Sequence, residues 1–279
     1  MPSTVLITGS SSGFGRAAVD RFLTAGWNVV ATLRDPAAWQ GEPSDQLLVQ
    51  ALDVRDEESV ATGVTAAVER FGVLDVVINN AGIGLFGPFE ASPAPLVHEV
   101  FDTNVFGPMR VIRQALPVFR GQGHGRFVNL SSGNATVPMP LQSVYSASKS
   151  ALYAFSESLT HELAGQNIQI KVVEPGFVPD SNFFSTTYGR YEGLSVPEAY
   201  QPTVRATLAG FADQPPAGYL ATSADVAQAL LDAATDTSGR LRSRVGQDSH
   251  ALEQARRQSD ADYDAWRETY FSATASSRS

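Results

Sequence analysis

The sequence predicts an α/β protein with one doubly wound parallel sheet of about seven strands and helices on both faces. Short apolar runs alternate with helical patterns along the first 180 residues, which is typical of parallel strands joined by right-handed crossovers. Small and polar residues follow the expected strand ends, where sheets of this kind bind ligands. The length of 279 residues and the 43% hydrophobic content fit one large domain with a substantial core.

Composition and charge exclude several classes of function. The net charge of −9 argues against a nucleic-acid-binding protein, which needs a basic face. The absence of cysteine excludes disulfides, thiolate metal sites and thiol nucleophiles, and the four histidines lack the spacing of metal ligands. The sequence has no run of 18 apolar residues and no signal-peptide pattern. We therefore expect a cytoplasmic protein without a membrane span or a metal site.

In the first half of the chain, each expected strand is a short apolar run and each expected helix has an apolar side. In the first helix, Ala18 and Phe22 lie on one side, and Gly26 ends it. Polar residues follow the strands, with Asp53 after the third and Asn79 after the fourth. We expect strands over 4–8, 28–33, 47–52 and 74–78, and helices over 16–25, 56–71 and 95–116, the last despite Gly107-Pro108.

The second half continues this alternation and then becomes less regular. Helix 144–163 carries an apolar stripe that includes Leu152 and Leu159, and Gly165 follows its end. We divide the chain into a catalytic domain over 1–250, with an irregular substrate lid over 181–222, and a C-terminal helical tail over 251–279. The remaining expected elements are strands over 126–130, 168–173 and 241–245, a helix over 224–234, and a polar helix over 251–271 with a fraying end over 272–279.

A glycine-rich turn, TGSSSGFG over 8–15, joins the first strand to the first helix. Glycines there let the backbone turn tightly and approach a pyrophosphate, whose charge the helix N-terminus stabilises. The spacing differs from the commoner GxGxxG, but the position between strand and helix indicates a dinucleotide-binding turn of the Rossmann type. We expect cofactor contacts from Gly9, Ser11, Ser12, Gly13, Phe14 and Gly15.

The end of the second strand bears on the choice between NAD(H) and NADP(H). An acidic residue there binds a ribose 2′-hydroxyl, whereas a basic residue accommodates a 2′-phosphate. Leu33 stands where the acid is expected and Arg34 follows it, so we predict NADP(H) over NAD(H). The alternative is that Arg34 is a solvated loop residue and Asp35 a turn cap. After the third strand, Asp53 is placed to hydrogen-bond the adenine amino group.

Three side chains that follow the fifth strand form a catalytic pattern. Tyr145 and Lys149 are four residues apart on a predicted helix and share one face, and Ser132 lies thirteen residues before the tyrosine. A nearby lysine favours the phenolate, so we expect it to lower the pKa of Tyr145 towards neutrality. Such a tyrosine can exchange a proton with a carbonyl or alcohol oxygen that the serine holds. A lone YxxxK arises by chance in many helices, so its surroundings decide.

Those surroundings resemble the classical short-chain dehydrogenase/reductase family over residues 4–180 and, more weakly, over 181–250. The resemblance rests on motifs that occur in the family's order: Thr8-Gly9 to Gly15, Leu52-Asp53-Val54, Asn79-Asn80-Ala81-Gly82, Asn104-Val105-Phe106-Gly107, Ser131-Ser132, Tyr145 to Lys149, and Pro175-Gly176. It implies an NAD(P)-dependent oxidoreductase that transfers a hydride between nicotinamide and a ketone or secondary alcohol. It also implies a homodimer or homotetramer.

The resemblance further implies roles for particular residues. Tyr145 would be the general acid in reduction, and Ser132 would orient the substrate carbonyl. Lys149 would lower the pKa of the tyrosine and bind the nicotinamide ribose, and Asn104 would anchor a water in a proton relay. Further cofactor contacts are implied for Val54, Asn80, Ala81, Gly82, Tyr145, Lys149, Pro175, Gly176 and Val178.

The chain departs from the family pattern after the sixth strand. Where the family offers a threonine to the nicotinamide carboxamide, this chain has Asp180, with Ser181 beside it. A carboxylate near the cofactor phosphates is unfavourable, so we expect Ser181 to substitute or the loop to shift. The family's basic residue before the second glycine is also absent, because Ser12 is there. Arg34 alone therefore argues for a 2′-phosphate.

Aromatic residues concentrate in the expected lid, at about twice the 9% of the whole chain. With walls from 133–141 and Phe86, such a lid favours a hydrophobic or aromatic ketone or alcohol. The alternative is that these rings only pack a long loop onto the body. A non-catalytic NAD(P)-sensing protein and a related lyase or epimerase are the competing functions. The aromatics are Phe183, Phe184, Tyr188, Tyr191, Tyr200, Phe211 and Tyr219.

Overall fold

Seven parallel strands form one sheet in the order β3-β2-β1-β4-β5-β6-β7, in a computed structural model that describes residues 2–212, 216 and 218–276. The predicted doubly wound α/β fold is confirmed, because the chain builds the sheet outward from β1 in both directions. Val5 of β1 pairs with Val29 on one side and with Val76 on the other. The strands are β1 Thr4–Ile7, β2 Asn28–Leu33, β3 Leu47–Ala51, β4 Val76–Asn79, β5 Gly125–Leu130, β6 Ile168–Pro175 and β7 Arg242–Val245.

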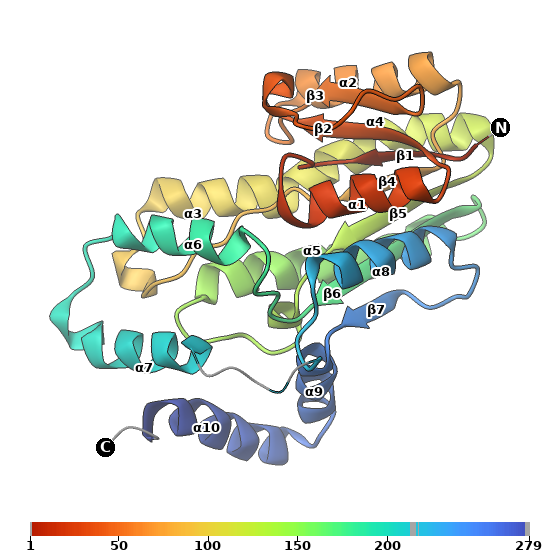
Figure 1. Ribbon diagram of the computed structural model, residues 1–279. Helices are drawn as coiled ribbons and strands as arrows, with labels where there is room; N and C mark the ends of the chain where they lie inside the picture. The colour runs from red at the N-terminus through yellow and green to blue at the C-terminus, as the bar shows by residue number, and fades with distance from the viewer. Residues whose placement is uncertain (1, 213–215, 217, 277–279) are drawn as a thin grey trace.

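Helices cover both faces of this sheet (Figure 1). Alternate residues of β1 point to opposite faces, so Val5 and Ile7 pack with α1 and α8, whereas Leu6 packs with α2, α4 and α5. The helices of these two layers are α1 Gly13–Thr24, α2 Glu57–Phe71, α4 Gly107–Gln122, α5 Ser143–Glu162 and α8 Ser223–Thr235. Short 3₁₀ turns lie at η1 Pro36–Ala38, η2 Phe89–Ala91, η4 Gly133–Ala135 and η5 Glu198–Tyr200.

The helix expected over 95–116 is three consecutive segments: α3 Ala94–Phe101, the π-helical turn η3 Asp102–Phe106, and α4. In a continuous α-helix, residue 108 would donate to the carbonyl of Asn104, but Pro108 has no backbone N–H. A π-helical turn accommodates this break, and such turns are frequent at functional sites. The turn contains Asn104, one of the expected site residues.

Two predictions for the second half are wrong. Residues 181–222, expected to be irregular, contain α6 Phe183–Glu192 and α7 Gln201–Ala212. The tail helix expected over 251–271 is two helices, α9 Gln247–Arg256 and α10 Asp260–Ser276. Ser259 separates them, because its hydroxyl accepts a hydrogen bond from the Asp262 N–H at 3.2 Å and caps α10. Parts of the lid and tail predictions, residues 213–215, 217 and 277–279, lie outside the described residues.

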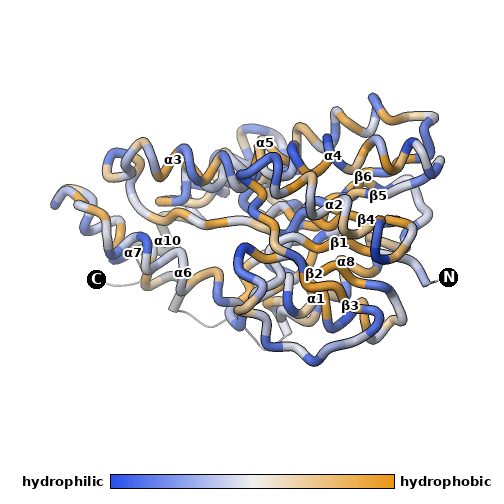
Figure 2. The backbone as a smooth tube through the Cα atoms, turned by 90° about the horizontal axis from the view of Figure 1, so that it is seen from above, coloured by the Kyte–Doolittle hydropathy of each residue, from blue (hydrophilic) through white to orange (hydrophobic). Residues whose placement is uncertain are grey.

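Three helices of the second half of the chain, α6, α7 and α10, gather at one end of the molecule. In Figures 1 and 2, α6, α7 and α10 lie at the end opposite the N-terminus, and α10 packs against α7. Figure 2 also shows that hydrophobic residues concentrate in the central strands. Among the described residues, no helix has both the length and the apolar character needed to cross a membrane.

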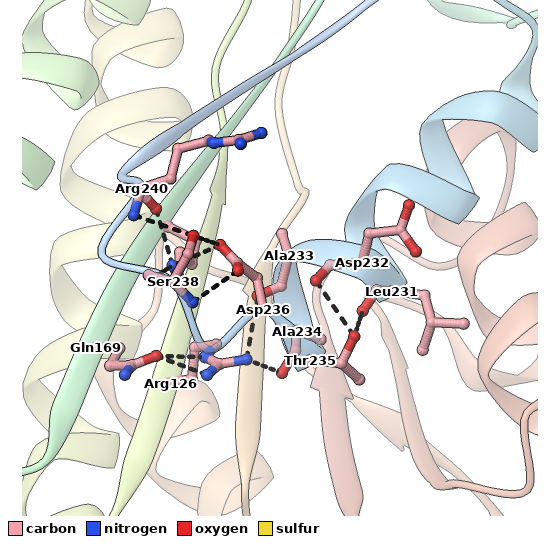
Figure 3. A network of polar contacts seen from close by, with 11 residues as sticks. Arg126, Gln169, Leu231, Asp232, Ala233, Ala234, Thr235, Asp236, Ser238 and Arg240 are labelled. Atoms are coloured by element: carbon pink, nitrogen blue, oxygen red, sulfur yellow. Dashed lines mark hydrogen bonds and ion pairs between the residues drawn. The ribbon is translucent and has the colours of Figure 1, made fainter.

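A polar network fixes the connection between α8 and β7 (Figure 3). Lys171 of β6 is buried, and its ammonium donates to Asp236 Oδ2 at 2.8 Å and to two backbone carbonyls of the connection. Arg126 of β5 donates to Gln169 and to the carbonyls of the last turn of α8. These bonds satisfy buried cations and hold β7 at the edge of the sheet.

Candidate active site

A cavity of about 480 Å³ opens beside the carboxyl ends of β5 and β6, and its walls include Ser132, Tyr145 and Lys149. Ser132 lies two residues after β5, whereas Tyr145 and Lys149 are one turn apart near the N-terminus of α5. The polar ends of β5 and α5 are joined by Ser131, whose hydroxyl donates to the Lys149 carbonyl at 3.3 Å. The fold therefore brings together the three side chains that the sequence pattern indicates.

Tyr145 is buried, and its ring lies against Phe183 of α6, with 5.3 Å between the ring centroids. Burial raises the pKa of the Tyr145 phenol to about 12, and a hydrogen bond with Ser132 opposes the rise. The expected fall of this pKa towards neutrality is therefore wrong here. The Lys149 ammonium is 5.9 Å from the ring centroid, and at that distance desolvation of the phenolate prevails. Tyr145 is thus an uncharged phenol, the form that can donate a proton.

Lys149 is a buried cation at the base of the cavity. Its Nζ donates to the carbonyl of Leu130 at 2.8 Å, which anchors it to the end of β5. Burial lowers the pKa of Lys149 to about 8. The side chain is consequently charged at neutral pH, and its ammonium contacts the Leu130 carbonyl and lies over the face of the Tyr145 ring.

Asn104 is held rigidly beside this lysine. Its Nδ2 donates to the Ile83 carbonyl at 2.9 Å and to Ser148 Oγ at 3.0 Å, and its Oδ1 accepts from the Ile83 N–H at 2.8 Å. A Cβ placed on Gly82 would lie 3.3 Å from Asn104 Oδ1 and 3.4 Å from Lys149 Nζ. The amide of Asn104 and the ammonium of Lys149 therefore both border the space that a side chain at position 82 would occupy.

The glycine-rich turn forms a cradle in which side chains have no room. Gly9 has a φ of +71°, and a Cβ there would lie 2.9 Å from the Ala81 Cα, while a Cβ on Gly15 would overlap the Gly9 carbonyl. Ser12 makes no side-chain capping bond, and the first turn of α1 has no acidic residue. The exposed helix N-terminus is thus suited to an anionic pyrophosphate, and these residues fit a dinucleotide.

Asn80 supports this cradle from β4. Its Nδ2 donates to the carbonyls of Thr8 and Gly9 at 2.8 and 3.0 Å. The Thr8 hydroxyl in turn accepts from the N–H groups of Asn80 and Ala81, both at 3.0 Å. Asn80 and Gly82 also line the cavity, so the expected ribose-side segment lies next to the expected phosphate-side turn.

The expected adenosine end lies after β2 and β3. Arg34 is exposed, and its charge contributes to lowering the pKa of Asp53. The main cause of that lower pKa is Arg55, which donates to both carboxylate oxygens at 2.9 to 3.2 Å. Asp35 caps the turn η1 by accepting from the Ala37 N–H at 3.0 Å. Val54 is buried against Gly107 rather than open to a ligand.

The loop after β6 shows how the chain accommodates Asp180 at the position where the family has a threonine. The Asp180 carboxylate accepts from the Ser223 N–H at 2.9 and 3.1 Å and so caps α8, away from the cavity. Ser181 donates to the Val178 carbonyl at 2.8 Å and lines the cavity. Pro175, Gly176 and Val178 line it as well. Asp180 therefore adds no carboxylate at the nucleotide, because the helix N-terminus takes it.

Aromatic and apolar side chains form most of the other walls. They come from the expected sources, namely the loop before α5, Phe86, and the lid helices α6 and α7. Leu141 in that loop has a φ of +59°, and its carbonyl accepts from the Gly87 N–H at 2.7 Å, which fixes the approach to α5. The lining residues from these sources are Phe86, Gly133, Asn134, Met139, Pro140, Gln142, Phe183, Phe184, Thr187, Tyr188 and Thr207.

Sequence reasoning missed the walls that come from the C-terminal helices. Asp248 and Leu252 of α9 and Trp266, Tyr270 and Phe271 of α10 all line the cavity. Their signal was present as an aromatic cluster over 263–271 in an otherwise polar stretch, but the pattern predicted only a polar helix and left open whether it covers the pocket or a neighbouring subunit. The side chain of Phe211, counted among the lid aromatics, lies outside the part of the chain whose side chains are described.

Comparisons with known proteins agree with this geometry. The family model for short chain dehydrogenases matches residues 3–188. An uncharacterized oxidoreductase of Schizosaccharomyces pombe is 34% identical over 203 residues, which cover 72% of this chain and 83% of the relative. Human retinol dehydrogenase 8 is 40% identical over 185 residues, which cover 63% of this chain and 58% of that protein.

Two solved structures extend the likeness to almost the whole chain. A short-chain dehydrogenase from Streptomyces avermitilis is similar with a TM-score of 0.79 and 30% identity, covering 98% of this chain and 99% of its own. A 3-ketoacyl-(acyl-carrier-protein) reductase from Brucella melitensis, complexed with NADH, is similar with a TM-score of 0.71 and 26% identity, covering 88% and 98%.

Proposed function

Because the chain belongs to the short-chain dehydrogenase family, whose oxidoreductases act on CH–OH and C=O groups, we propose that it is an NADP(H)-dependent carbonyl reductase or alcohol dehydrogenase. Its substrate is a hydrophobic or aromatic ketone or the corresponding secondary alcohol. The observation that carries the proposal is the grouping of Ser132, Tyr145 and Lys149 at the wall of a cavity lined by aromatic side chains.

The side chains at this wall have complementary roles. In reduction, the bound nicotinamide cofactor supplies the hydride to the carbonyl carbon. Ser132 holds the carbonyl oxygen by a hydrogen bond, and Tyr145 donates a proton to the same oxygen as negative charge develops on it. Lys149 stabilises that charge and binds the nicotinamide ribose. Asn104 anchors a water that returns a proton towards Tyr145.

Replacing the phenol tests this mechanism. Tyr145→Phe removes the proton donor and keeps the ring, so we expect ketone turnover to fall by about 10² to 10⁴-fold while the affinity for NADPH changes little. Lys149→Ala removes both a charge and a ribose contact, so it lowers turnover and cofactor affinity together. Steady-state kinetics and fluorescence titration with NADPH measure the two effects. Full activity of Tyr145→Phe would falsify the mechanism.

The substrate class follows from the walls of the cavity. Phe86, Phe183, Phe184 and Trp266 leave a mostly apolar space above Tyr145. The similar human protein is named a retinol dehydrogenase, which also supports an apolar alcohol or ketone. A panel of ketones that differ in size and polarity tests this class. Turnover of small polar keto acids alone would reject it.

Preference for NADP(H) rests on Arg34. The residue is exposed at the end of β2 and close enough to affect Asp53, so its guanidinium is available for a 2′-phosphate. We expect Arg34→Ala to weaken NADPH binding about tenfold or more and to leave NADH binding nearly unchanged. Titration of both cofactors with both proteins is the measurement. Preference of the wild-type protein for NADH contradicts this part of the proposal.

A cytoplasmic location stays a prediction. We also propose that the protein forms a homodimer or homotetramer. Phe106, the last residue of η3, is 50% exposed, and a large apolar side chain at that position is suited to an interface between copies. Sedimentation analysis decides between one chain and several. A mass of one chain at micromolar concentration contradicts the oligomer.

A further inference from the structure

The carboxylate of Asp248 contacts the loop that follows β6. Asp248 lies in the first turn of α9, and its Oδ2 accepts from the Phe177 N–H at 2.6 Å. It also lies so close to Gly176 that a Cβ on this glycine would overlap the carboxylate. Both Gly176 and Asp248 line the cavity. The contact joins a segment beyond residue 188, where the family match ends, to the expected nicotinamide side of the site.

The same loop is fixed again at its other end. Asp180 leaves the loop and caps α8 through Ser223, while the Gly176 N–H donates to Val245 of β7 at 3.0 Å. Between these points the Phe177 N–H has the Asp248 carboxylate as its acceptor. Two carboxylates thus tie residues 176–180 to α8 and α9.

The bond to Phe177 is of a strong kind. A carboxylate that accepts from a backbone N–H forms a charge-assisted hydrogen bond, and a buried N–H that loses its acceptor is costly. Burial raises the pKa of Asp248, and the Phe177 N–H is the largest of the interactions that lower it. The Asp248 carboxyl group and the backbone of the loop therefore hold each other in position through this bond.

We propose that Asp248 is a positioning residue that holds the Gly176–Phe177 backbone in place for the nicotinamide half of the cofactor. The inference rests on the proposed binding of a nicotinamide dinucleotide. This chain has Asp180 where the family has a threonine, and Asp180 bonds α8. A side chain of α9, Asp248, therefore fixes the backbone of the loop instead. Asp248 acts through the backbone and does not itself take part in proton or hydride transfer.

Cofactor fragments separate this role from a general effect on folding. NADPH contains the nicotinamide half, whereas 2′,5′-ADP contains only the adenosine half with its phosphates. We expect Asp248→Ala to weaken NADPH binding about tenfold to a hundredfold, the range of one charge-assisted hydrogen bond, and to change 2′,5′-ADP binding less than about twofold. Asp248→Asn keeps an acceptor oxygen and should recover most of the NADPH affinity.

A matched control is available on α10. Asp262 is also a C-terminal carboxylate next to a helix start, but it bonds Ser259 and does not line the cavity. Asp262→Ala should leave both affinities as in the wild type. Isothermal titration of the four proteins, with thermal unfolding of each, provides the data. If wild-type protein prefers NADH, the pair NADH and ADP replaces the phosphorylated pair.

Two results overturn the inference. One is unchanged NADPH affinity in Asp248→Ala, and the other is an equal loss of both ligands, which indicates general destabilisation. Neither result depends on turnover, so the test is distinct from that of the proposed activity. Selective loss of NADPH in a protein that reduces no ketone would support the role of Asp248 and reject the substrate proposal.

Discussion

At the scale of single residues, Lys149 combines a functional position with an unfavourable environment. It is buried beside a tyrosine and an amide, and its ammonium donates a hydrogen bond to the carbonyl of Leu130. Removing an ammonium from water costs free energy, which is why its pKa falls to about 8 from 10.5. A buried ammonium lowers the stability of the folded protein, and such a cost is typical of residues that serve activity.

The depressed pKa gives a prediction with a definite sign. Between pH 8 and 10.5 the unfolded chain binds more protons at this residue than the folded chain, so the free energy of unfolding should rise with pH. Lys149→Met removes the titrating group and should stabilise the protein at pH 7 by roughly 3 kcal/mol. The gain should shrink as pH approaches 10.5. Urea unfolding of both proteins at pH 7, 9 and 10.5 measures it, and a variant that is less stable throughout contradicts it.

At the scale of elements, α6 closes the cavity because of a glycine on the opposite segment. A Cβ on Gly84 would overlap Thr187 Oγ1 and lie 2.8 Å from the Phe183 ring. The absence of a side chain there lets α6 approach the segment after β4 and brings Phe183 onto Tyr145. The position of α6 over the cavity thus depends on the absence of a side chain at Gly84.

Gly84→Ala should displace α6 without touching the catalytic residues. Overpacking of this kind costs about 1–3 kcal/mol, so we expect KM for an aromatic ketone to rise roughly tenfold while NADPH affinity stays the same. The double variant Gly84→Ala/Thr187→Ala removes the closest clash and should recover part of the loss. Steady-state kinetics with one ketone compares the three proteins. Equal KM values in all of them would show that α6 does not shape the substrate site.

Elements also show what the sequence could and could not predict. Strands such as β2 and β6 were predicted within one or two residues, because long apolar runs between turn residues admit few alternatives. The lid helices α6 and α7 were missed, since α7 packs against α10 and the aromatic rings of α6 pack against Phe86 and Tyr145 rather than against the sheet, so no regular apolar stripe results. The raised pKa of Tyr145 was missed because burial is a property of the assembled lid. The pairing of Asp248 with Phe177 joins segments 71 residues apart and has no local signal.

At the scale of the whole molecule, the cavity is enclosed by two parts of the chain that are distant in sequence. The floor comes from β5, β6 and α5, and part of the roof comes from α10, which packs against α7. Trp266 occupies the centre of an aromatic row, with ring centroids 5.8 Å from Tyr263 and 4.6 Å from Tyr270. The C-terminal helix therefore forms part of the cavity wall and is not an appended tail.

Trp266→Ala should reveal this contribution through selectivity. Loss of a large aromatic wall removes contacts with a large ligand but few with a small one. We expect kcat/KM for an aromatic ketone to fall about tenfold or more, whereas the value for a ketone of three or four carbons should change little. NADPH affinity should be unaffected. A uniform loss for all ketones would mean that Trp266 serves only the stability of α10.

The enclosure by α10 has a consequence for the order of events during synthesis. Domains form progressively as a chain leaves the ribosome, N-terminal parts first. The residues proposed to cradle the pyrophosphate and to carry the proton precede residue 150, whereas Asp248, Trp266 and Phe271 are made later. A nascent chain can thus acquire a nucleotide platform well before it has a closed pocket for an apolar ligand. Until then, the apolar face that α10 will cover is open to chaperones.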